Sequence, residues 1–281
     1  MNKISVIGSG TMGAGIAQAA ALAGFEVVLY DLSDDLLASA IDQIHKSIDK
    51  GVARGKTETT VAKTAKKNIY LTTSLVEAAH VDLVIEAVPE KMNLKREIFA
   101  ALDEVAHEHT IFSSNTSSLS IGVLASSTHR QDRFLGVHFF NPAHIMKLVE
   151  LIRGDFTSEE TITAVQDTVT QMGKTAVLCK DTPAFIVNRV ARPFYGEALR
   201  LLGENAAGIE TIDKLIKSLG FRMGPFELID LVGCDVNFAV TQSVYDAYFQ
   251  EPKYRPHPIQ RRMVESERLG RKSGRGFYDY T

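Results

Sequence analysis

A glycine-rich turn near the N-terminus restricts the fold more than any other part of the chain. The apolar run of residues 4–7 leads into "GSGTMG", in which Gly8, Gly10 and Gly13 have G-x-G-x-x-G spacing, and a second β-type run occupies residues 27–30. In such a βαβ unit the first glycine permits a tight turn, the second lets a pyrophosphate approach the backbone, and the third lets the helix pack closely on the strand. The N–H groups and the dipole at the helix start favour phosphate charge. The turn therefore predicts a dinucleotide-binding unit.

The acidic residue after the second β-type run indicates which dinucleotide is bound. Asp31 lies 18 positions after Gly13, close to the spacing of about 20 at which a carboxylate meets the ribose hydroxyls. A carboxylate at this place would repel a 2′-phosphate, so NAD is favoured over NADP. A second role for Asp31, capping the helix that follows Ser33, is compatible with the first.

Strand and helix patterns alternate through the first part of the chain. The further helices that we expect lie at 33–54, 57–67 and 91–107, and the further strands at 82–88, 110–116 and 133–140. This alternation is typical of an α/β fold with a Rossmann-type, doubly wound and mostly parallel sheet. Ligands of such sheets bind beyond the carboxyl ends of the strands, where residues 86–90, 113–118 and 138–141 are expected.

Beyond "KTAVLCKDTP" the pattern becomes helical throughout. A long helix pattern follows Pro183, and Pro193 is expected to kink it. Further helices are expected at about 208–219, 224–231 and 235–249. The sequence therefore predicts a Rossmann domain at residues 1–182 and an all-α domain at residues 183–281.

The stretch "HFFNPAHIMKLVELI" places two ionisable side chains among apolar ones. His138 ends an expected strand, and the break at Asn141-Pro142 permits a reversal that would bring Glu150 beside the imidazole. A carboxylate at one ring nitrogen fixes the tautomer and favours the protonated form, so the other nitrogen can exchange a proton with a substrate. A histidine beside two phenylalanines is more often a satisfied core residue, and Glu150 could belong to the surface of an edge strand. Both interpretations stay open at this point.

Composition argues against several other kinds of function. With 31 basic and 34 acidic side chains the formal net charge is −3, which gives no reason to expect nucleic acid or an anionic membrane as partner. Cys179 and Cys234 form no CxxC pair, so we expect no disulfide framework and no metal site, and a cytoplasmic location fits best. Glycine and polar residues interrupt the uncharged stretch 4–25, which therefore predicts neither a signal peptide nor a membrane span.

Six segments together resemble one enzyme family. They are "VIGSGTMGAGIAQ", "SSNTSSLSI", "GVHFFNPAHIMKLVELI", "DTPAFIVNR", "GPFELIDLVG" and "GRKSGRGFYDY". On these segments the chain is similar over its full length to the L-3-hydroxyacyl-CoA dehydrogenase family, and within it to the bacterial 3-hydroxybutyryl-CoA dehydrogenases. The resemblance implies a homodimer in which the helical domain contributes to substrate binding and dimerisation.

The resemblance also implies roles for single residues. His138 would be the catalytic base with Glu150 as its partner, Ser117 would bind the reacting oxygen or position the substrate, and Asn188 would help to hold the 3-hydroxyl or 3-keto group. The residues implied in NAD binding are Gly8, Gly10, Thr11, Met12, Gly13, Asp31, Glu90, Lys95, Asn115, Ser117, Asn141 and Lys272. Without the resemblance, Ser117 would be taken for a loop residue and Lys272 for part of a solvated tail.

A coenzyme A site is implied at the end of the second expected helix. Ser47 and the loop "GVARGK", which contains Arg54 and Lys56, align with positions that contact CoA in relatives. Several relatives carry lysine where this chain has Arg54, and arginine would meet a phosphate with a planar fork rather than a point charge. The alternative is a solvated helix end.

The implied reaction is the interconversion of (S)-3-hydroxyacyl-CoA and 3-ketoacyl-CoA with NAD, with short acyl chains such as 3-hydroxybutyryl-CoA and acetoacetyl-CoA. A dehydrogenase of similar architecture that acts on another hydroxy acid, of the gulonate or carnitine type, is the alternative enzyme. A dinucleotide-binding protein without catalysis is the alternative from another class, because fold alone does not determine function.

Overall fold

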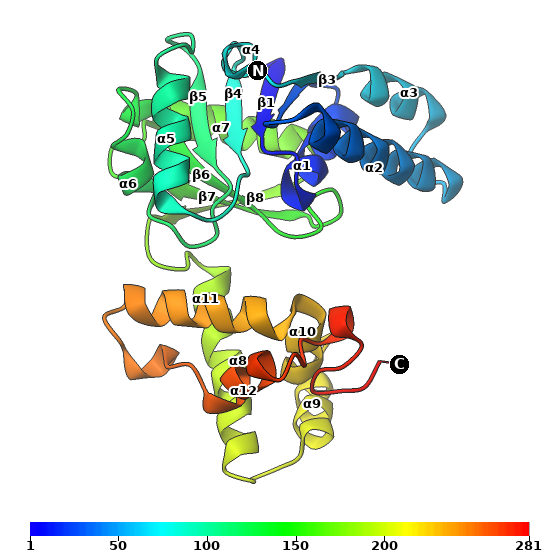
Figure 1. Ribbon diagram of the computed structural model, residues 1–281, viewed down its shortest axis with the longest axis vertical. Helices are drawn as coiled ribbons and strands as arrows, with labels where there is room; N and C mark the ends of the chain where they lie inside the picture. The colour runs from blue at the N-terminus through cyan, green and yellow to red at the C-terminus, as the bar shows by residue number, and fades with distance from the viewer. Residues whose placement is uncertain (281) are drawn as a thin grey trace. The chain divides into compact units, whose positions relative to one another are not determined.

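The computed structural model describes residues 1–280, which form two compact units (Figure 1). The first unit, Met1–Thr182, combines a sheet with helices, and the second, which begins at Pro183, is built from helices. We call them the α/β unit and the helical unit. The predicted fold class, a doubly wound and mostly parallel sheet followed by an all-α part, is confirmed.

The α/β unit contains one sheet of eight strands. In chain order the strands are β1 (Lys3–Ile7), β2 (Glu26–Tyr30), β3 (Ile69–Thr72), β4 (Leu83–Glu86), β5 (Ile111–Ser114), β6 (Phe134–Phe139), β7 (Leu148–Arg153) and β8 (Thr175–Lys180). Their order across the sheet is β3-β2-β1-β4-β5-β6-β7-β8, and all neighbours are parallel except β6 and β7. The sequence did not predict β3 and β8, which are the two edge strands. Edge strands are partly exposed, so they lack the continuous apolar run of a buried parallel strand.

Helices cover both faces of this sheet. They are α1 (Thr11–Leu22), α2 (Asp34–Ala53), α3 (Thr59–Lys67), α4 (Leu75–Ala79), α5 (Met92–Asp103), α6 (Ile121–Ala125) and α7 (Glu159–Gln171), with a 3-10 turn at Gln131–Arg133. One core cluster joins α1, α2, α3 and α7 to the sheet. On the opposite face, Phe99 of α5 packs against Phe112 and Phe134, whose side chains alternate with those of the first cluster.

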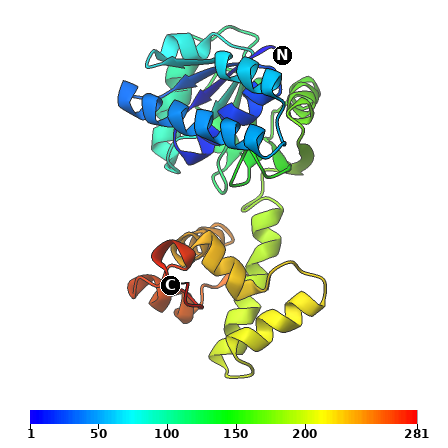
Figure 2. The ribbon, with the colours of Figure 1, turned by 90° about the vertical axis from the view of Figure 1, so that its right-hand side faces the viewer.

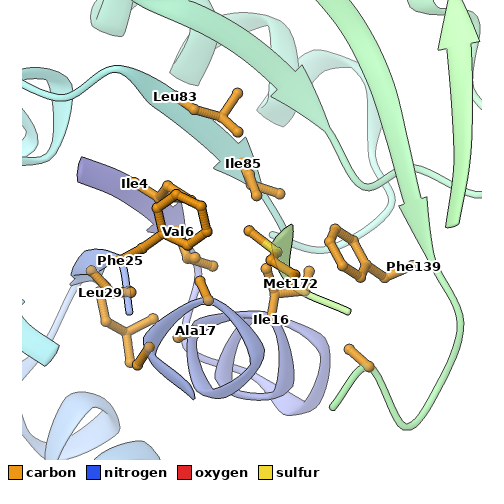
Figure 3. Packing of buried hydrophobic residues seen from close by; sticks show 14 of the residues in the cluster. Ile4, Val6, Ile16, Ala17, Phe25, Leu29, Leu83, Ile85, Phe139 and Met172 are labelled. Carbon is orange, nitrogen blue, oxygen red and sulfur yellow. The ribbon is translucent and has the colours of Figure 1, made fainter. Parts of the chain in front are cut away.

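The close packing of α1 on the sheet depends on small side chains. Nine of its 12 residues are buried, and most of these are alanine or glycine. Figure 3 shows Ile16 of α1 against Val6 of β1 and Ile85 of β4. A Cβ added to Gly13 would lie 1.8 Å from the carbonyl oxygen of Gly8, so only glycine lets the helix approach the first strand this closely. The role predicted for the third glycine of the motif is therefore present.

Between residues 183 and 280 the helical unit forms no β-strand (Figure 2). Its helices are α8 (Val187–Gly203), α9 (Ile209–Ser218), α10 (Pro225–Val232), α11 (Cys234–Ala247) and α12 (Pro258–Glu265), with 3-10 turns at Pro252–Tyr254 and Arg271–Ser273. The sequence analysis did not predict α12. The structure assigns one continuous helix, α8, on both sides of Pro193.

Two buried aspartates connect segments of the helical unit by accepting hydrogen bonds from backbone N–H groups. Asp213 of α9 accepts hydrogen bonds from the N–H groups of Phe226 and Glu227 and thereby caps the start of α10. Asp230 of α10 accepts from the N–H groups of Phe277 and Tyr278. The C-terminal segment is therefore fixed to α10 by its backbone, which places the loop that carries Lys272.

No helix formed by residues 1–280 combines the length and the apolar composition needed to cross a membrane.

Candidate functional site

The glycine loop joins β1 to α1 and leaves helix N–H groups without side-chain caps. Gly8 has a φ of 101°, which residues with a side chain rarely adopt, and a Cβ there would lie 2.9 Å from the carbonyl oxygen of Ala87. Gly10 is the N-cap of α1, and Thr11 and Met12 form its first turn. A Cβ at Gly10 would meet no protein atom within 4 Å, so the fold itself does not require glycine there. The N–H groups of this first turn have no partner inside the helix and suit an anion.

Asp31 lies beside this loop, at the end of β2. Its Oδ2 accepts hydrogen bonds from the backbone N (2.7 Å) and Oγ (2.6 Å) of Ser9, and its Oδ1 accepts from Leu32 N. Burial raises the pKa of Asp31, but these hydrogen bonds outweigh burial, and the pKa lies below its ordinary value. An ionised carboxylate keeps further lone pairs for hydroxyl donors. The alternative capping role falls to Ser33, which accepts from Leu36 N.

A buried cation with two carboxylates lies at the carboxyl end of β4. Lys95 of α5 is only 1% exposed, and its Nζ lies 2.7 Å from Glu86 Oε1 and 3.1 Å from Glu90 Oε2. Burial raises the pKa of Glu86 in spite of Lys95. Burial also acts on Glu90, but the charge of Lys95 and several hydrogen bonds hold its pKa below the ordinary value. The ammonium of Lys95 therefore faces two protein carboxylates, and Glu90 is the more exposed of them.

Glu90 in turn organises the loop after β5. Its Oε1 accepts hydrogen bonds from Thr116 Oγ1, from the backbone N of Ser117 (3.0 Å) and from Ser118 Oγ (3.3 Å). The hydroxyl of Ser117 lies 3.4 Å from the same oxygen. The position of Ser117, a residue expected to meet substrate, is thus set by Glu90 and, behind it, by Lys95.

His138 and Glu150 are directly opposite each other on β6 and β7. The antiparallel register pairs the two residues, and His138 Nδ1 lies 2.7 Å from Glu150 Oε2. Both side chains are buried, and the imidazole also packs on Phe140 with 4.4 Å between ring centroids. The chain reversal expected after Asn141-Pro142 is confirmed by this register.

The chain between β6 and β7 is fixed by backbone and side-chain contacts. Asn115, at the end of β5, accepts a hydrogen bond from Phe139 N (2.9 Å) and so ties the loop after β5 to the end of β6. The buried Lys174 donates to the carbonyl oxygens of Ala143 (2.6 Å) and Met146 (2.9 Å). These contacts hold the reversal, at whose start the exposed Asn141 lies.

A thiol near the pair is not activated. Cys179 of β8 is half-buried, and burial followed by the charge of Glu150 raises its pKa to about 12. A thiol with this pKa is protonated at neutral pH and is a weak nucleophile. We therefore assign no nucleophilic role to Cys179.

The residues expected at coenzyme A lie together at the end of α2. Ser47 is partly exposed on the last turns of the helix, and Arg54 and Lys56 are exposed just after it. Neither cation forms an ion pair with a carboxylate of residues 1–280. The helix end carries negative partial charge, which favours cations at this place, so their position alone does not demand a ligand.

Asn188 and Lys272 belong to the helical unit. Asn188 is the second residue of α8. Lys272 Nζ lies 2.6 Å from the carboxylate of Asp235 in the first turn of α11. Burial raises the pKa of Asp235, but the hydrogen bond from Lys272, together with further hydrogen bonds and the charge of Lys272, outweighs burial and lowers that pKa. The ammonium expected to meet NAD is therefore oriented by a carboxylate that the sequence analysis missed.

The other residues that the sequence analysis missed act behind the expected ones. Glu86 anchors Lys95, Thr116 supports Glu90, and Lys174 holds the β6–β7 reversal. Glu86 carried a signal, since it is an acidic residue inside the apolar run "DLVIEAV". Lys174 carried none, because its acceptors are backbone carbonyl groups.

Two family models match the chain in succession. One described as "3-hydroxyacyl-CoA dehydrogenase, NAD binding domain" matches residues 3–182, and one described as "3-hydroxyacyl-CoA dehydrogenase, C-terminal domain" matches residues 185–280. Together they account for nearly all of the sequence.

Individual relatives agree with these matches. The chain is 46% identical over its whole length to a 3-hydroxyadipyl-CoA dehydrogenase of Escherichia coli, of which it spans 59%. It is 43% identical to the mitochondrial hydroxyacyl-coenzyme A dehydrogenase of Homo sapiens, and the alignment covers all of this chain and 91% of that protein. A probable 3-hydroxybutyryl-CoA dehydrogenase of Bacillus subtilis is 42% identical, with 100% and 98% covered.

Solved structures show the same similarity. An (S)-3-hydroxybutyryl-CoA dehydrogenase from Ralstonia eutropha superposes with a TM-score of 0.96 at 41% identity, covering 100% of this chain and 99% of that one. A diketoreductase superposes with a TM-score of 0.88 at 31% identity and the same coverage. The chain therefore belongs to the 3-hydroxyacyl-CoA dehydrogenase family and is an NAD-dependent oxidoreductase.

Proposed function

We propose that the protein interconverts short-chain (S)-3-hydroxyacyl-CoA and 3-ketoacyl-CoA esters, with 3-hydroxybutyryl-CoA and acetoacetyl-CoA as the reference pair. The observation that carries this proposal is the hydrogen bond between His138 Nδ1 and Glu150 Oε2. The pair lies at the ligand side of a Rossmann-type sheet in an NAD-dependent family. The names of the relatives from Escherichia coli, Bacillus subtilis and Ralstonia eutropha support hydroxyacyl-CoA esters as substrates.

The His138–Glu150 pair supplies the proton chemistry of this reaction. NAD, when bound, supplies the acceptor for the hydride that leaves C3. In the oxidative direction, the ring nitrogen opposite Glu150 takes the proton of the 3-hydroxyl group, and the carboxylate stabilises the imidazolium that forms. In the reductive direction the same imidazolium returns the proton to the developing alkoxide. Ser117 and Asn188 hold the oxygen at C3 in this proposal.

The residues of the α/β unit fit a bound NAD. The first turn of α1, with Gly10, Thr11 and Met12, offers N–H groups to the pyrophosphate, and Asp31 offers a carboxylate to the ribose. Glu90 is the exposed member of its ion pair with Lys95, so we assign direct contact to Glu90 and an indirect role to Lys95.

The remaining NAD contacts that we propose come from both units. Asn115 and Ser117 follow β5 and Asn141 follows β6, and the ends of these two parallel strands lie at the same side of the sheet as His138. Lys272 belongs to the helical unit, where Asp235 orients it. Coenzyme A would be held at Ser47, Arg54 and Lys56, whose two cations suit its phosphates.

The helical unit takes part in substrate binding and in dimer formation in this proposal. It exposes large apolar side chains on and after α9, among them Leu215, Leu219 and Phe221. Exposed apolar surface of this kind is typical of subunit interfaces. A homodimer in the cytoplasm is the state that we propose for the enzyme.

A dehydrogenase of another hydroxy acid or carbonyl compound is the second candidate. The diketoreductase, and an NAD-dependent dehydrogenase of a pyridine carboxylic acid with a TM-score of 0.79 at 28% identity, show that this fold accompanies other substrates. Good activity on a free hydroxy acid with poor activity on acyl-CoA esters would favour this candidate.

Loss of NADH absorbance with acetoacetyl-CoA at neutral pH tests the proposal. We expect rapid loss with NADH, and little loss when NADPH replaces NADH or free acetoacetate replaces the ester. A sample that binds NADH but turns over none of these substrates would contradict the proposal and favour a binding protein without catalysis.

A further inference from the structure

The helical unit contains a cluster of buried polar side chains for which the proposed function has no use. It consists of Arg192 of α8, Asn237 and Thr241 of α11, and Gln260 of α12. Each is more than nine-tenths buried, with Arg192 at 6% exposed. Burial of polar groups at this depth is costly unless they find partners, and burial of a charge is more costly still.

The partners of Arg192 are all neutral. Its Nη1 donates to the carbonyl oxygen of Asn237 (3.1 Å) and to Thr241 Oγ1 (3.0 Å), and its Nε donates to the carbonyl oxygen of Asn188 (3.2 Å). Its Nη2 donates to no atom of residues 1–280. The guanidinium also stacks near the ring of Tyr195, 5.0 Å from its centroid.

No carboxylate of residues 1–280 forms an ion pair with Arg192. Burial lowers the pKa of Arg192 to about 10, which leaves the side chain charged at neutral pH. The cluster also contains a second unused donor, since the buried Nδ2 of Asn237 has no hydrogen-bond partner in the described part of the chain. A buried cation and a buried amide N–H that find no anion among residues 1–280 suit a carboxylate that a ligand supplies.

The position of Arg192 on α8 suggests where that carboxylate comes from. Arg192 follows Asn188 by four residues, so the two lie on one face of the helix, about 6 Å apart along its axis. The bond from Arg192 Nε to Asn188 O draws the guanidinium back over the turn of Asn188. A substrate atom held by Asn188 and a carboxylate bound by Arg192 could therefore belong to the same small molecule.

We propose that Arg192, with Asn237, binds a carboxylate at the far end of the acyl chain, so that the preferred substrates are 3-hydroxyacyl-CoA esters of dicarboxylic acids. The inference rests on the proposed function, in which Asn188 holds the oxygen at C3. A carboxyl carbon three bonds beyond C3, as in a six-carbon chain, extends about 4 Å at about 1.5 Å a bond, which is comparable with one helical turn. Because Nε and Nη1 of Arg192 already have acceptors, the donors that remain for this carboxylate are its Nη2 and the Nδ2 of Asn237, and hydrogen bonds between ionised groups are the strong ones.

A comparison of two CoA esters with three enzymes tests the inference. The esters are acetoacetyl-CoA, whose chain ends in a methyl group, and 3-oxoadipyl-CoA, whose chain ends in a carboxylate; the enzymes are the wild type, Arg192→Met and Arg192→Lys. Hydrogen bonds to charged groups contribute about 1.5–3 kcal/mol. We therefore expect Arg192→Met to lower kcat/KM for 3-oxoadipyl-CoA by about 10- to 100-fold, with less than about threefold change for acetoacetyl-CoA. Arg192→Lys should restore part of the loss, because it keeps the charge without the planar fork.

Arg200→Met provides a matched control, because it removes the same charge from the same helix at a half-exposed site that pairs with Glu197. It should change neither ester's kcat/KM. Equal losses on both esters with Arg192→Met, or a wild type that does not prefer 3-oxoadipyl-CoA, would overturn the inference and leave the proposed function standing. A wild type that turns over neither ester would overturn both.

Discussion

Two buried cations in this protein differ in what surrounds them. Lys95 in the α/β unit contacts the carboxylates of Glu86 and Glu90, whereas Arg192 in the helical unit contacts only neutral oxygens. Both side chains are almost fully buried, so burial does not explain the difference. The comparison separates groups that the fold itself satisfies from groups that need something outside the chain.

The same distinction applies to two glycines of the loop after β1. Gly13 is required by the fold, because a Cβ there would lie 1.8 Å from the carbonyl oxygen of Gly8. Gly10 is not, because a Cβ there would meet no protein atom within 4 Å. Substitutions that affect folding should therefore be separable from substitutions that affect binding.

The largest effect is expected from His138. Its contact with Glu150 lies within the protein, whereas the group with which we propose that it exchanges a proton belongs to the substrate. We expect His138→Gln to lower kcat by about 10²- to 10⁴-fold, the usual contribution of general acid–base catalysis. Steady-state kinetics with acetoacetyl-CoA measure this loss. NADH affinity and Tm should stay near wild-type values, and retained turnover would contradict the role of His138.

The two cations should respond differently to methionine. Lys95→Met leaves the fully buried carboxylate of Glu86 and the partly exposed one of Glu90 without their cation, and we expect the free energy of unfolding to fall by about 3–5 kcal/mol. Arg192→Met removes a buried charge that has no anion, so we expect a change within about 1 kcal/mol or a gain in stability. Urea unfolding of both variants at one protein concentration tests the contrast, and a larger loss for Arg192→Met would reverse the comparison.

The two glycines sharpen the comparison at smaller magnitude. Gly13→Ala should destabilise the protein by about 1–3 kcal/mol or more, because the added methyl group forces the helix away from β1. Gly10→Ala should leave stability nearly unchanged and weaken NADH binding. Thermal unfolding together with NADH titration distinguishes the two, and normal NADH affinity in Gly10→Ala would refute the predicted approach of the pyrophosphate.

The smallest effect is expected from the half-exposed pair Asp235–Lys272. The pKa of Asp235 in the folded protein lies below its ordinary value of 3.8, so its contribution to stability is present above pH 3.8 and is lost as the pH falls below that value. Asp235→Asn should therefore cost about 0.2–1 kcal/mol at pH 7 and progressively less in acid. When Asp235→Asn is made in the Lys272→Met variant, it should change stability little, because the ion pair is already absent. A double-mutant cycle measures this difference. An undiminished cost would show that Lys272 is not the partner through which Asp235 stabilises the protein.

Much of the α/β unit could be predicted from the sequence because its signals are local. The glycine spacing, the buried apolar strands and the alternation with helices each follow from neighbouring residues. The reversal after Asn141-Pro142 could also be predicted, because proline ends a strand. The edge strands β3 and β8 could not, since their partly exposed residues show no continuous apolar pattern.

The contacts behind the candidate site were beyond prediction because they join distant segments. Lys95 and Glu86 are nine residues apart, but Lys272 and Asp235 are 37 apart and Arg192 and Thr241 are 49 apart. A sequence shows that such residues are charged or polar without showing which of them meet. Their burial, which decides what each pairing is worth, becomes visible only in the folded chain.

The single antiparallel pairing in the sheet ties the proposed chemistry to strand register. His138 and Glu150 are 12 residues apart and directly opposite across β6 and β7. A slip of one residue would place Val149 or Leu151 opposite His138 and turn Glu150 to the other face of the sheet. Lys174, by holding the carbonyl groups of the connecting segment, then does more than stabilise a loop. It fixes the path of the segment that sets this register. An insertion of one residue in that segment would therefore separate His138 from Glu150 while most of the sheet remained intact.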